Sequence, residues 1–110
     1  AASSDYPLRD VYKRQDRHNQ WLNIVSSVNG SAPIRIHQDA NISVLELDEG
    51  KTITFEVKAE RQAYLVLIEG KSLINGVELT MRDALESVEE TLNIQATENS
   101  HYLVIEMRKN

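Results

Sequence analysis

The sequence contains no cysteine, only two prolines and four glycines, and no hydrophobic run that could cross a membrane. Without cysteine there can be no disulfide bond, no thiolate metal site and no cysteine nucleophile. A membrane span needs about 20 consecutive apolar residues, so we expect no membrane association. The first residues show no apolar signal segment either, and the lack of cysteine fits a reducing compartment. We therefore expect a cytoplasmic protein.

Positive charge is also scarce, because 12 basic residues stand against 17 acidic ones and give a net charge of −5. Binding to nucleic acid depends on clustered lysine and arginine, so nucleic acid is not an expected partner. The chain has 110 residues, of which 41% are hydrophobic. This length and composition predict one domain with one core.

The first 18 residues differ from the remainder of the chain. They are polar and show neither a strand period nor a helix period. The stretch PLRDVYKRQ resembles a translated sequencing adapter of the kind found in metagenomic gene sequences, which predicts a non-native start and a longer natural protein. We therefore divide the chain into a mobile leader, residues 1–18, and a single domain, residues 19–110.

Within the domain, hydrophobic residues alternate with polar ones almost throughout. Ile53, Phe55 and Val57 alternate strictly with polar neighbours, which is typical of a strand with one buried face. Residues 63–68 are apolar on both faces, as expected for a strand at the centre of a sandwich or barrel. Asn75-Gly76 lies between two apolar segments and predicts a type I′ hairpin, because both residues tolerate positive φ.

Residues 81–90 permit two interpretations. The spacing of Leu85 and Val88, with Asp83 as a possible cap, fits a short helix. Residues 84–88 fit a short strand equally well, and the neighbouring pattern favours the strand. With about eight to ten short strands, the sequence predicts an all-β fold, a small antiparallel β-barrel or jelly roll.

The glycine spacing resembles the cupin family, whose first motif is G-x5-H-x-H-x(3,4)-E-x6-G and whose second is G-x5-P-x-G-x2-H-x3-N. Gly50 and Gly70 fit the longer form of the first motif, and Gly76 opens the second. The metal ligands of both motifs are absent. The two His positions of the first motif hold Glu56 and Lys58, its Glu position holds Ala63, and the His position of the second motif holds Ser87.

A shift of one residue would place Phe55 and Val57 at the two His positions instead, as the alternation of hydrophobic residues suggests. Neither alignment supplies an imidazole, so we expect no metal and no other cofactor at these positions.

A closer resemblance covers residues 20–107. Residues 34–39 (IRIHQD), 59–66 (AERQAYLV) and 74–77 (INGV) are similar to the C-terminal cupin of pirin-like, quercetinase-type bicupins. The resemblance implies a double-stranded β-helix. It also implies that the N-terminal cupin of such proteins, with three His and one Glu, holds the metal that opens quercetin with dioxygen, while the C-terminal cupin is usually metal-free and packs against it.

Other candidate sites have simpler explanations. His37 and His101 could belong to an unconventional metal site with a carboxylate, but no His-x-His spacing supports it, and ordinary structural roles are commoner. Acidic side chains at 48–49 and 86–90 could form a catalytic pair, although such clusters are usually solvated turns. Four aromatic side chains could line a ligand cavity or simply pack in the core: Trp21, Phe55, Tyr64 and Tyr102.

Two functions remain open at this point. The first is a metal-free, non-catalytic scaffold domain that packs against a partner cupin or forms a homodimer. The second is a small-molecule-binding or quercetin dioxygenase-like cupin that uses unconventional metal ligands. The missing histidines favour the first function, for which we expect no catalytic residues.

Overall fold

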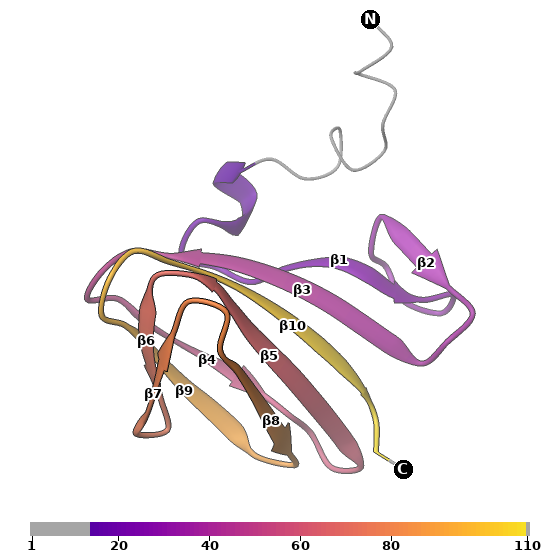
Figure 1. Cartoon of the computed structure of the whole chain (residues 1–110). Coiled ribbons are helices and arrows are strands. Elements are labelled where there is room, and N and C mark those ends of the chain that lie inside the picture. Colours follow the sequence, from indigo (N-terminus) through magenta and orange to yellow (C-terminus); the bar gives the residue numbers. More distant parts are fainter. Residues whose placement is uncertain (1–13, 110) are drawn as a thin grey trace, which may run out of the picture.

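The computed structural model describes residues 14–109, and side chains from residue 16. A short 3₁₀ helix, η2 (Arg14–Arg17), precedes the strands (Figure 1). Ten strands follow in the described part of the chain: β1 (Leu22–Ser27), β2 (Ile34–Ile36), β3 (Ala40–Leu47), β4 (Thr52–Glu56), β5 (Arg61–Glu69), β6 (Lys71–Ile74), β7 (Val77–Thr80), β8 (Ala84–Val88), β9 (Thr91–Ala96) and β10 (Ser100–Arg108). No described helix is long and apolar enough to span a membrane.

The strands form two sheets that pack face to face (Figure 1). The larger has the order β2-β1-β3-β10-β5-β8 and the smaller has the order β4-β9-β6-β7. Nearly all pairs are antiparallel, as predicted, but β1 and β2 pair in parallel. The resulting two-layer jelly roll confirms the predicted all-β fold.

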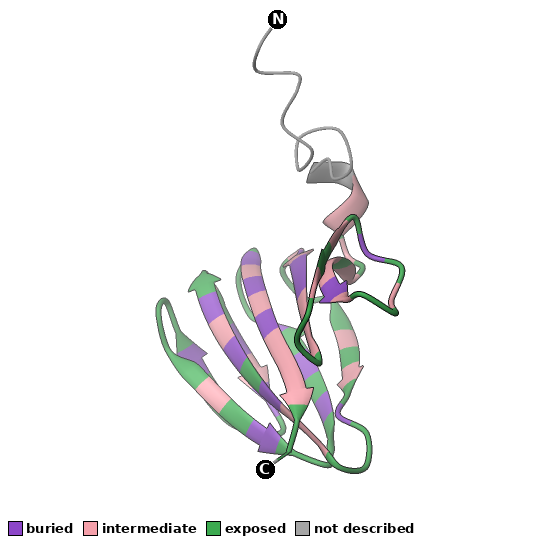
Figure 2. Cartoon of the chain, turned by 90° about the vertical axis from the view of Figure 1, so that its right-hand side faces the viewer, coloured by how far each residue is buried: buried purple, intermediate pink, exposed green. Residues whose placement is uncertain are grey.

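The core lies between the two sheets. From the larger sheet it receives Leu45, Leu65, Leu67, Tyr102 and Val104, and from the smaller sheet Ile74, Leu79, Leu92, Ile94 and Ala96, all at most 2% exposed. Buried and more exposed positions alternate along the strands (Figure 2). This alternation follows from the two-residue period of a β-strand, which sends successive side chains to opposite faces.

The predicted hairpin at Asn75-Gly76 is confirmed. Both residues have positive φ, 49° and 82°, and Ile74 pairs with Val77 across the two-residue turn. The ambiguous segment 81–90 contains strand β8 rather than a helix. Asp83 does not cap a helix. Its carboxylate accepts hydrogen bonds from the backbone N–H and the hydroxyl of Thr80, the last residue of β7.

The end of the proposed leader contacts the larger sheet, while residues 1–13 lie outside the described part. The Arg17 guanidinium lies 3.5 Å from the Glu46 carboxylate, and the His18 ring lies 2.9 Å from that of Asp48. Asn19 then binds β3 through its backbone N–H to the Glu46 carbonyl and through its side chain to Asp48. Residue 19 is thus held by more hydrogen bonds than residue 18.

Candidate functional site

The positions that correspond to the first cupin motif offer no metal ligand to the interior. Phe55 and Val57 face the core, as the hydrophobic alternation predicted, whereas Glu56 and Lys58 are exposed to solvent. Phe55 packs edge to face against Trp21, with 5.1 Å between ring centroids. This face of β4 is therefore occupied by hydrocarbon packing.

The two remaining motif positions lie next to each other in the interior. Ala63 on β5 pairs with Ser87 on β8, and both are buried. The Ser87 hydroxyl donates a 2.8 Å hydrogen bond to the Glu90 carboxylate, so it is engaged in the β8–β9 turn. A methyl group and a neutral hydroxyl do not fit a site for iron, nickel or copper, which prefer imidazole and carboxylate.

The alternative histidine site is not assembled either. His37 follows β2 near the Ala40 end of β3, whereas His101 pairs with Glu46 near the opposite end. Because a strand rises about 3.3 Å per residue, the six steps from Ala40 to Glu46 put the two histidines on the order of 20 Å apart. Within residues 14–109, no three His, Cys, Asp or Glu side chains are arranged to hold a metal ion.

Of the acidic side chains singled out from the sequence, Asp48, Glu89 and Glu90 make contacts at turns, whereas Glu86 lies within β8. The Glu89 carboxylate accepts the backbone N–H of Glu60 and pairs with Lys109, and these contacts hold its pKa below the usual range. Hydrogen bonds from Asn19 and then His18 lower the pKa of Asp48. Carboxylates with lowered pKa values stay ionised at neutral pH and are poorly suited to general acid catalysis.

The four aromatic side chains do not line a common cavity. Tyr102 is fully buried in the core, and Trp21 packs on Phe55 while its indole N–H donates to the Thr54 carbonyl. Tyr64 is 42% exposed on the opposite face of the larger sheet. The packing interpretation therefore holds for three of the four.

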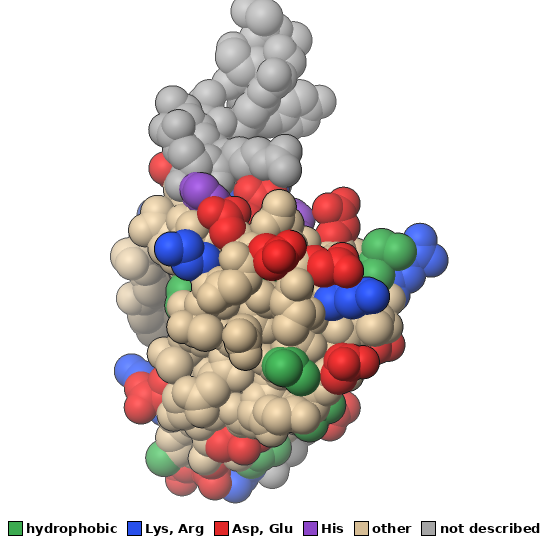
Figure 3. Space-filling view, turned by 90° about the vertical axis from the view of Figure 1, so that its left-hand side faces the viewer, with side chains coloured by type: hydrophobic (Ala, Val, Ile, Leu, Met, Phe, Trp, Pro, Cys, Tyr) green, Lys and Arg blue, Asp and Glu red, His purple; other side chains and the backbone are tan. Residues whose placement is uncertain are grey.

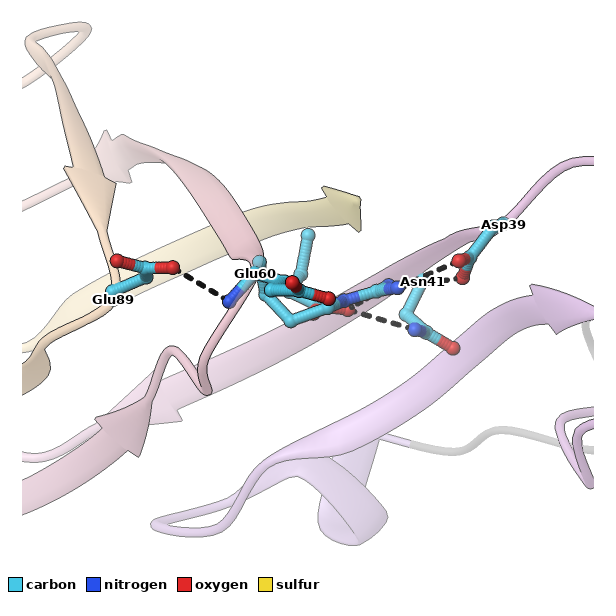
Figure 4. A network of polar contacts seen from close by, with 6 residues as sticks. Asp39, Asn41, Glu60 and Glu89 are labelled. Carbon is cyan, nitrogen blue, oxygen red and sulfur yellow. Dashed lines mark hydrogen bonds and ion pairs between the residues drawn. The ribbon is translucent and has the colours of Figure 1, made fainter. Parts of the chain in front are cut away.

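A polar network that the sequence did not predict lies where the hydrophobic core ends (Figure 4). Arg61, at the start of β5, forms an ion pair with Glu106 on β10 through Nε and Nη2, and binds both Asp39 carboxylate oxygens at 2.8 Å through Nη1. Asn41 on β3 donates a 2.8 Å hydrogen bond to Glu106. Arg61 thereby ties the loop before β3 to β5 and β10.

The charges of this network are mutually stabilised. Hydrogen bonding to Glu106 raises the pKa of Arg61, and Asp39 adds to this effect against the opposing effect of burial. Burial alone would raise the pKa of Glu106, but hydrogen bonds from Arg61 and Asn41 lower it overall. Because Nε, Nη1 and Nη2 of Arg61 all donate to Glu106 or Asp39, the network is a structural clamp rather than an open anion site.

One sequence signal could have revealed this clamp. Glu106 continues the inward alternation of Tyr102 and Val104, so a charged side chain falls at an inward position near the end of a strand. Such a side chain requires a partner. Asp39 and Arg61 also lie in two of the segments that carry the family resemblance, and the fold brings them into contact.

The outer face of the larger sheet is largely apolar. Cross-strand pairs place Leu22, Val44, Leu103 and Val66 in one row, Ile42, Ile105 and Tyr64 in the next, and Ala40, Met107, Gln62 and Val88 in a third. We call these eleven positions the outer apolar face. The second row continues from Tyr64 to Glu86 on the edge strand β8, and Glu86 is the one charged side chain in these three rows. Tyr64 and Val88, at 42% and 48% exposure, border a hollow of about 280 Å³ that Ile105 and Met107 also line.

The two stacked sheets and the positions of Gly50, Gly70 and Gly76 at turns define a single cupin domain. The sequence model of the quercetinase C-terminal cupin domain matches residues 23–107. The chain belongs to this family, as its sequence motifs suggested.

Comparisons with individual proteins agree with this assignment. The chain is 29% identical over 98 residues to a Pseudomonas aeruginosa protein provisionally named a quercetin 2,3-dioxygenase, and 27% identical over 97 residues to a pirin-like protein of Caulobacter vibrioides. The alignments cover 87% and 86% of this chain but 42% of each relative. The chain thus spans less than half the length of these curated relatives.

Solved structures show the same fold. The bacterial pirin YhhW of Escherichia coli, solved with nickel(II), superimposes with a TM-score of 0.73 at 24% identity over 82% of this chain and 40% of that protein. A quercetin 2,3-dioxygenase of Acinetobacter baumannii gives a TM-score of 0.70 at 20% identity over 80% of this chain and 32% of that protein. At these identities the likeness concerns the fold alone.

Proposed function

We propose that this chain is a metal-free, non-catalytic cupin domain that acts as a scaffold and packs against a second cupin domain through the outer apolar face. The observation that carries the proposal is the three rows of mostly hydrophobic side chains across five strands of the larger sheet. An antiparallel sheet in water usually has one polar face, because only the other is needed for the core. An apolar second face therefore favours a protein partner.

The positions of the metal motifs support the non-catalytic part of the proposal. Opening a flavonol with dioxygen requires a redox metal held by imidazole and carboxylate. This chain has Phe55, Val57, Ala63 and Ser87 at the inward positions where such ligands would stand. Chemistry of that kind would have to reside in the partner cupin.

Where this chain is present without another cupin, a second copy can cover the same surface. Two copies related by a two-fold axis bury the same patch on both subunits. We therefore expect a homodimer in sedimentation equilibrium at about 100 μM, a concentration at which an interface of standard size persists. A strictly monomeric chain at this concentration would contradict the proposed interface.

A matched pair of variants tests which surface forms the interface. Val88→Lys introduces a charge on edge strand β8 within the outer apolar face, and we expect it to weaken the dimer at least tenfold, because a buried unpaired ammonium is costly. Val77→Lys makes the same change on edge strand β7 of the other sheet, at 50% instead of 48% exposure. Equal weakening by both variants, or by neither, would argue against this face.

Elemental analysis tests the metal-free part separately. We expect the purified protein to contain far less than one equivalent of iron, nickel, copper or zinc. Near-stoichiometric metal that is lost in a His37→Ala/His101→Ala variant would overturn the scaffold assignment and favour a binding or dioxygenase-like cupin with unconventional ligands.

A further inference from the structure

The outer face of the smaller sheet holds a hollow without a single charged side chain. This hollow has a volume of about 720 Å³ and is lined by Thr52, Ile53, Thr54, Leu73, Asn75, Gly76, Asn93, Ile94 and Gln95. Charged residues make up 26% of the whole sequence. Figure 3 shows the side of the molecule on which β6 and β7 lie, with a broad surface free of charged groups and charged side chains around it.

Strand pairing fixes the arrangement of the polar groups in this hollow. Thr54 pairs with Asn93 across β4 and β9, and Thr52 pairs with Gln95, which also pairs with Leu73 on β6. Adjacent strands lie about 4.8 Å apart, and side chains on one face repeat about every 6.6 Å along a strand. Two hydroxyls and two amides therefore occupy the corners of a small rectangle, with the Leu73 side chain beside it.

The polar side chains of this rectangle are available for a ligand. Within residues 14–109, the side chains of Thr52, Thr54, Asn93 and Gln95 form no hydrogen bond with the protein. Asn75 differs, because its side-chain Nδ2 donates a hydrogen bond to the Thr91 carbonyl and its Oδ1 accepts one from the Asn93 backbone N–H. Asn75 therefore fixes the end of the hollow where the β6–β7 turn meets β9, while the other four side chains remain free.

We propose that this surface, the Thr/Asn/Gln face, binds a neutral polyhydroxylated ligand, namely an uncharged oligosaccharide chain. Amide and hydroxyl groups both donate and accept hydrogen bonds, as sugar hydroxyls require. The Leu73 side chain and the threonine methyl groups offer apolar contact to the C–H faces of a sugar ring. Three charged side chains border the face: Glu56, Glu78 and Lys71. Because Lys71 pairs with Glu98, the two glutamates are expected to disfavour acidic chains.

This surface lies on the opposite side of the sandwich from the outer apolar face. Binding to a partner cupin would leave it open to solvent. The inference therefore does not depend on the proposed scaffold role, and either can fail without the other.

Titration of the ¹⁵N-labelled chain with neutral oligosaccharides tests the inference. The probes are maltohexaose and cellohexaose at up to about 10 mM, a range that detects even weak binding, and tri-galacturonic acid serves as the acidic comparison. We expect at least one neutral probe to shift the side-chain NH₂ signals of Asn93 and Gln95, with a weaker response to the acidic probe. No shift with either neutral probe, or an equal response to the acidic one, would overturn the proposal.

A pair of double variants assigns the surface. Asn93→Ala/Gln95→Ala removes both amides, and we expect it to weaken binding at least tenfold. Asn29→Ala/Gln38→Ala removes the same two residue types at exposed positions outside the smaller sheet, and binding should be unchanged. All four side chains are exposed, so both proteins should melt like the parent, and unchanged binding in the first variant would refute the assignment.

Discussion

At the scale of single residues, a hydrogen-bond relay through the core joins the two sheets. The phenol of Tyr102 on β10 donates a 2.7 Å bond to the hydroxyl of Ser72 on β6, which donates a 2.9 Å bond to the Gln95 carbonyl on β9. Tyr102 and Ser72 are both fully buried. Because neither group can turn to water, each depends on the other as its partner.

We expect Tyr102→Phe to lower the free energy of unfolding by about 1 kcal/mol, and Ser72→Ala to lower it by about 2 kcal/mol, since the serine variant removes the hydroxyl to which the buried phenol donates. In the double variant that phenol is gone as well, so its cost should be smaller than the sum of the two. Urea denaturation measures all three. Additive costs would show that the relay is not a coupled unit.

The same tyrosine gives the fold a sensitivity to alkali. Burial raises the pKa of Tyr102, although hydrogen bonding with Ser72 and Ser100 opposes the shift. The folded state therefore favours the protonated phenol, and its contribution to stability is complete below about pH 10 and is lost as the pH rises further through the folded pKa. Tyr102→Phe should remove this part of the alkaline destabilisation.

The Arg61 clamp should make the stability of the fold sensitive to acid rather than to alkali. The lowered pKa of Glu106 means that its ionised form stabilises the fold above about pH 4.5, and that this contribution is lost as the pH falls through the lower folded pKa. In Arg61→Met the carboxylate keeps its burial without its main partner, so its pKa should rise. Lowering the pH would then stabilise the variant, because it protonates the unpaired Glu106 carboxylate, while it destabilises the parent.

We therefore expect Arg61→Met to cost about 2 kcal/mol at neutral pH, less than a fully buried pair would because both side chains are partly exposed. The difference from the parent should shrink between about pH 5 and pH 3. Arg108→Met, on the neighbouring exposed residue of β10, is the control. A constant difference across this pH range would show that the clamp does not act through the charge of Glu106.

At the scale of elements, the ends of strands depend on residues that can adopt positive φ. Gly50 and Gly70 both do so, at 83° and 95°, but their surroundings differ. A Cβ atom at Gly50 would meet nothing within 4 Å, whereas at Gly70 it would overlap the Asn99 carbonyl and the Ser100 side chain and backbone. The turn between β5 and β6 therefore requires glycine for its space as well as its conformation.

Alanine substitutions at Gly50 and Gly70 should distinguish the cost of the backbone conformation from the cost of the missing space. We expect Gly50→Ala to cost about 1 kcal/mol, for the backbone conformation alone. Gly70→Ala should cost about 3 kcal/mol, because overpacking against the β9–β10 turn is added to the same conformational cost. Thermal melting at matched pH gives the comparison. Equal costs would mean that the β9–β10 turn moves aside without penalty.

Local patterns predicted most strands, because alternation and turn chemistry are encoded within a few residues. The inward set Ile53, Phe55 and Val57 and the Asn75-Gly76 hairpin needed nothing beyond their neighbours. Strand β8 was ambiguous because its helical and strand patterns are equally good, and pairing with β5 decides between them. Tertiary context, which the local sequence does not contain, made the difference.

The sites were harder to predict than the strands. The motif positions showed which metal ligands were missing, because ligand chemistry follows from residue type alone. The clamp was not predicted, because Arg61 lies 22 residues from Asp39 and 45 from Glu106. The outer apolar face became visible only when the registers of five strands were known.

At the scale of the whole molecule, the sequence predicts a domain boundary close to residue 19. Removing residues 1–18 would delete the Arg17–Glu46 and His18–Asp48 pairs. The second of these is half exposed and contributes little. The first is only 14% and 16% exposed, but it is a single 3.5 Å contact rather than a two-point pair like that of Arg61 with Glu106, so we expect it to account for most of a small loss. Asn19 would remain, with hydrogen bonds to the Glu46 carbonyl and to Asp48.

We therefore expect a chain that begins at Asn19 to unfold within about 1 kcal/mol of the full chain, or roughly 5 °C in melting temperature. A chain that begins at Leu22 should lose at least about 2 kcal/mol, because it also lacks the Trp21 ring that packs on Phe55 and bonds to Thr54. Differential scanning calorimetry of the three chains locates the boundary. A large loss already in the Asn19 chain would place the leader inside the fold, and equal stability of both truncated chains would show that Trp21 contributes nothing to it.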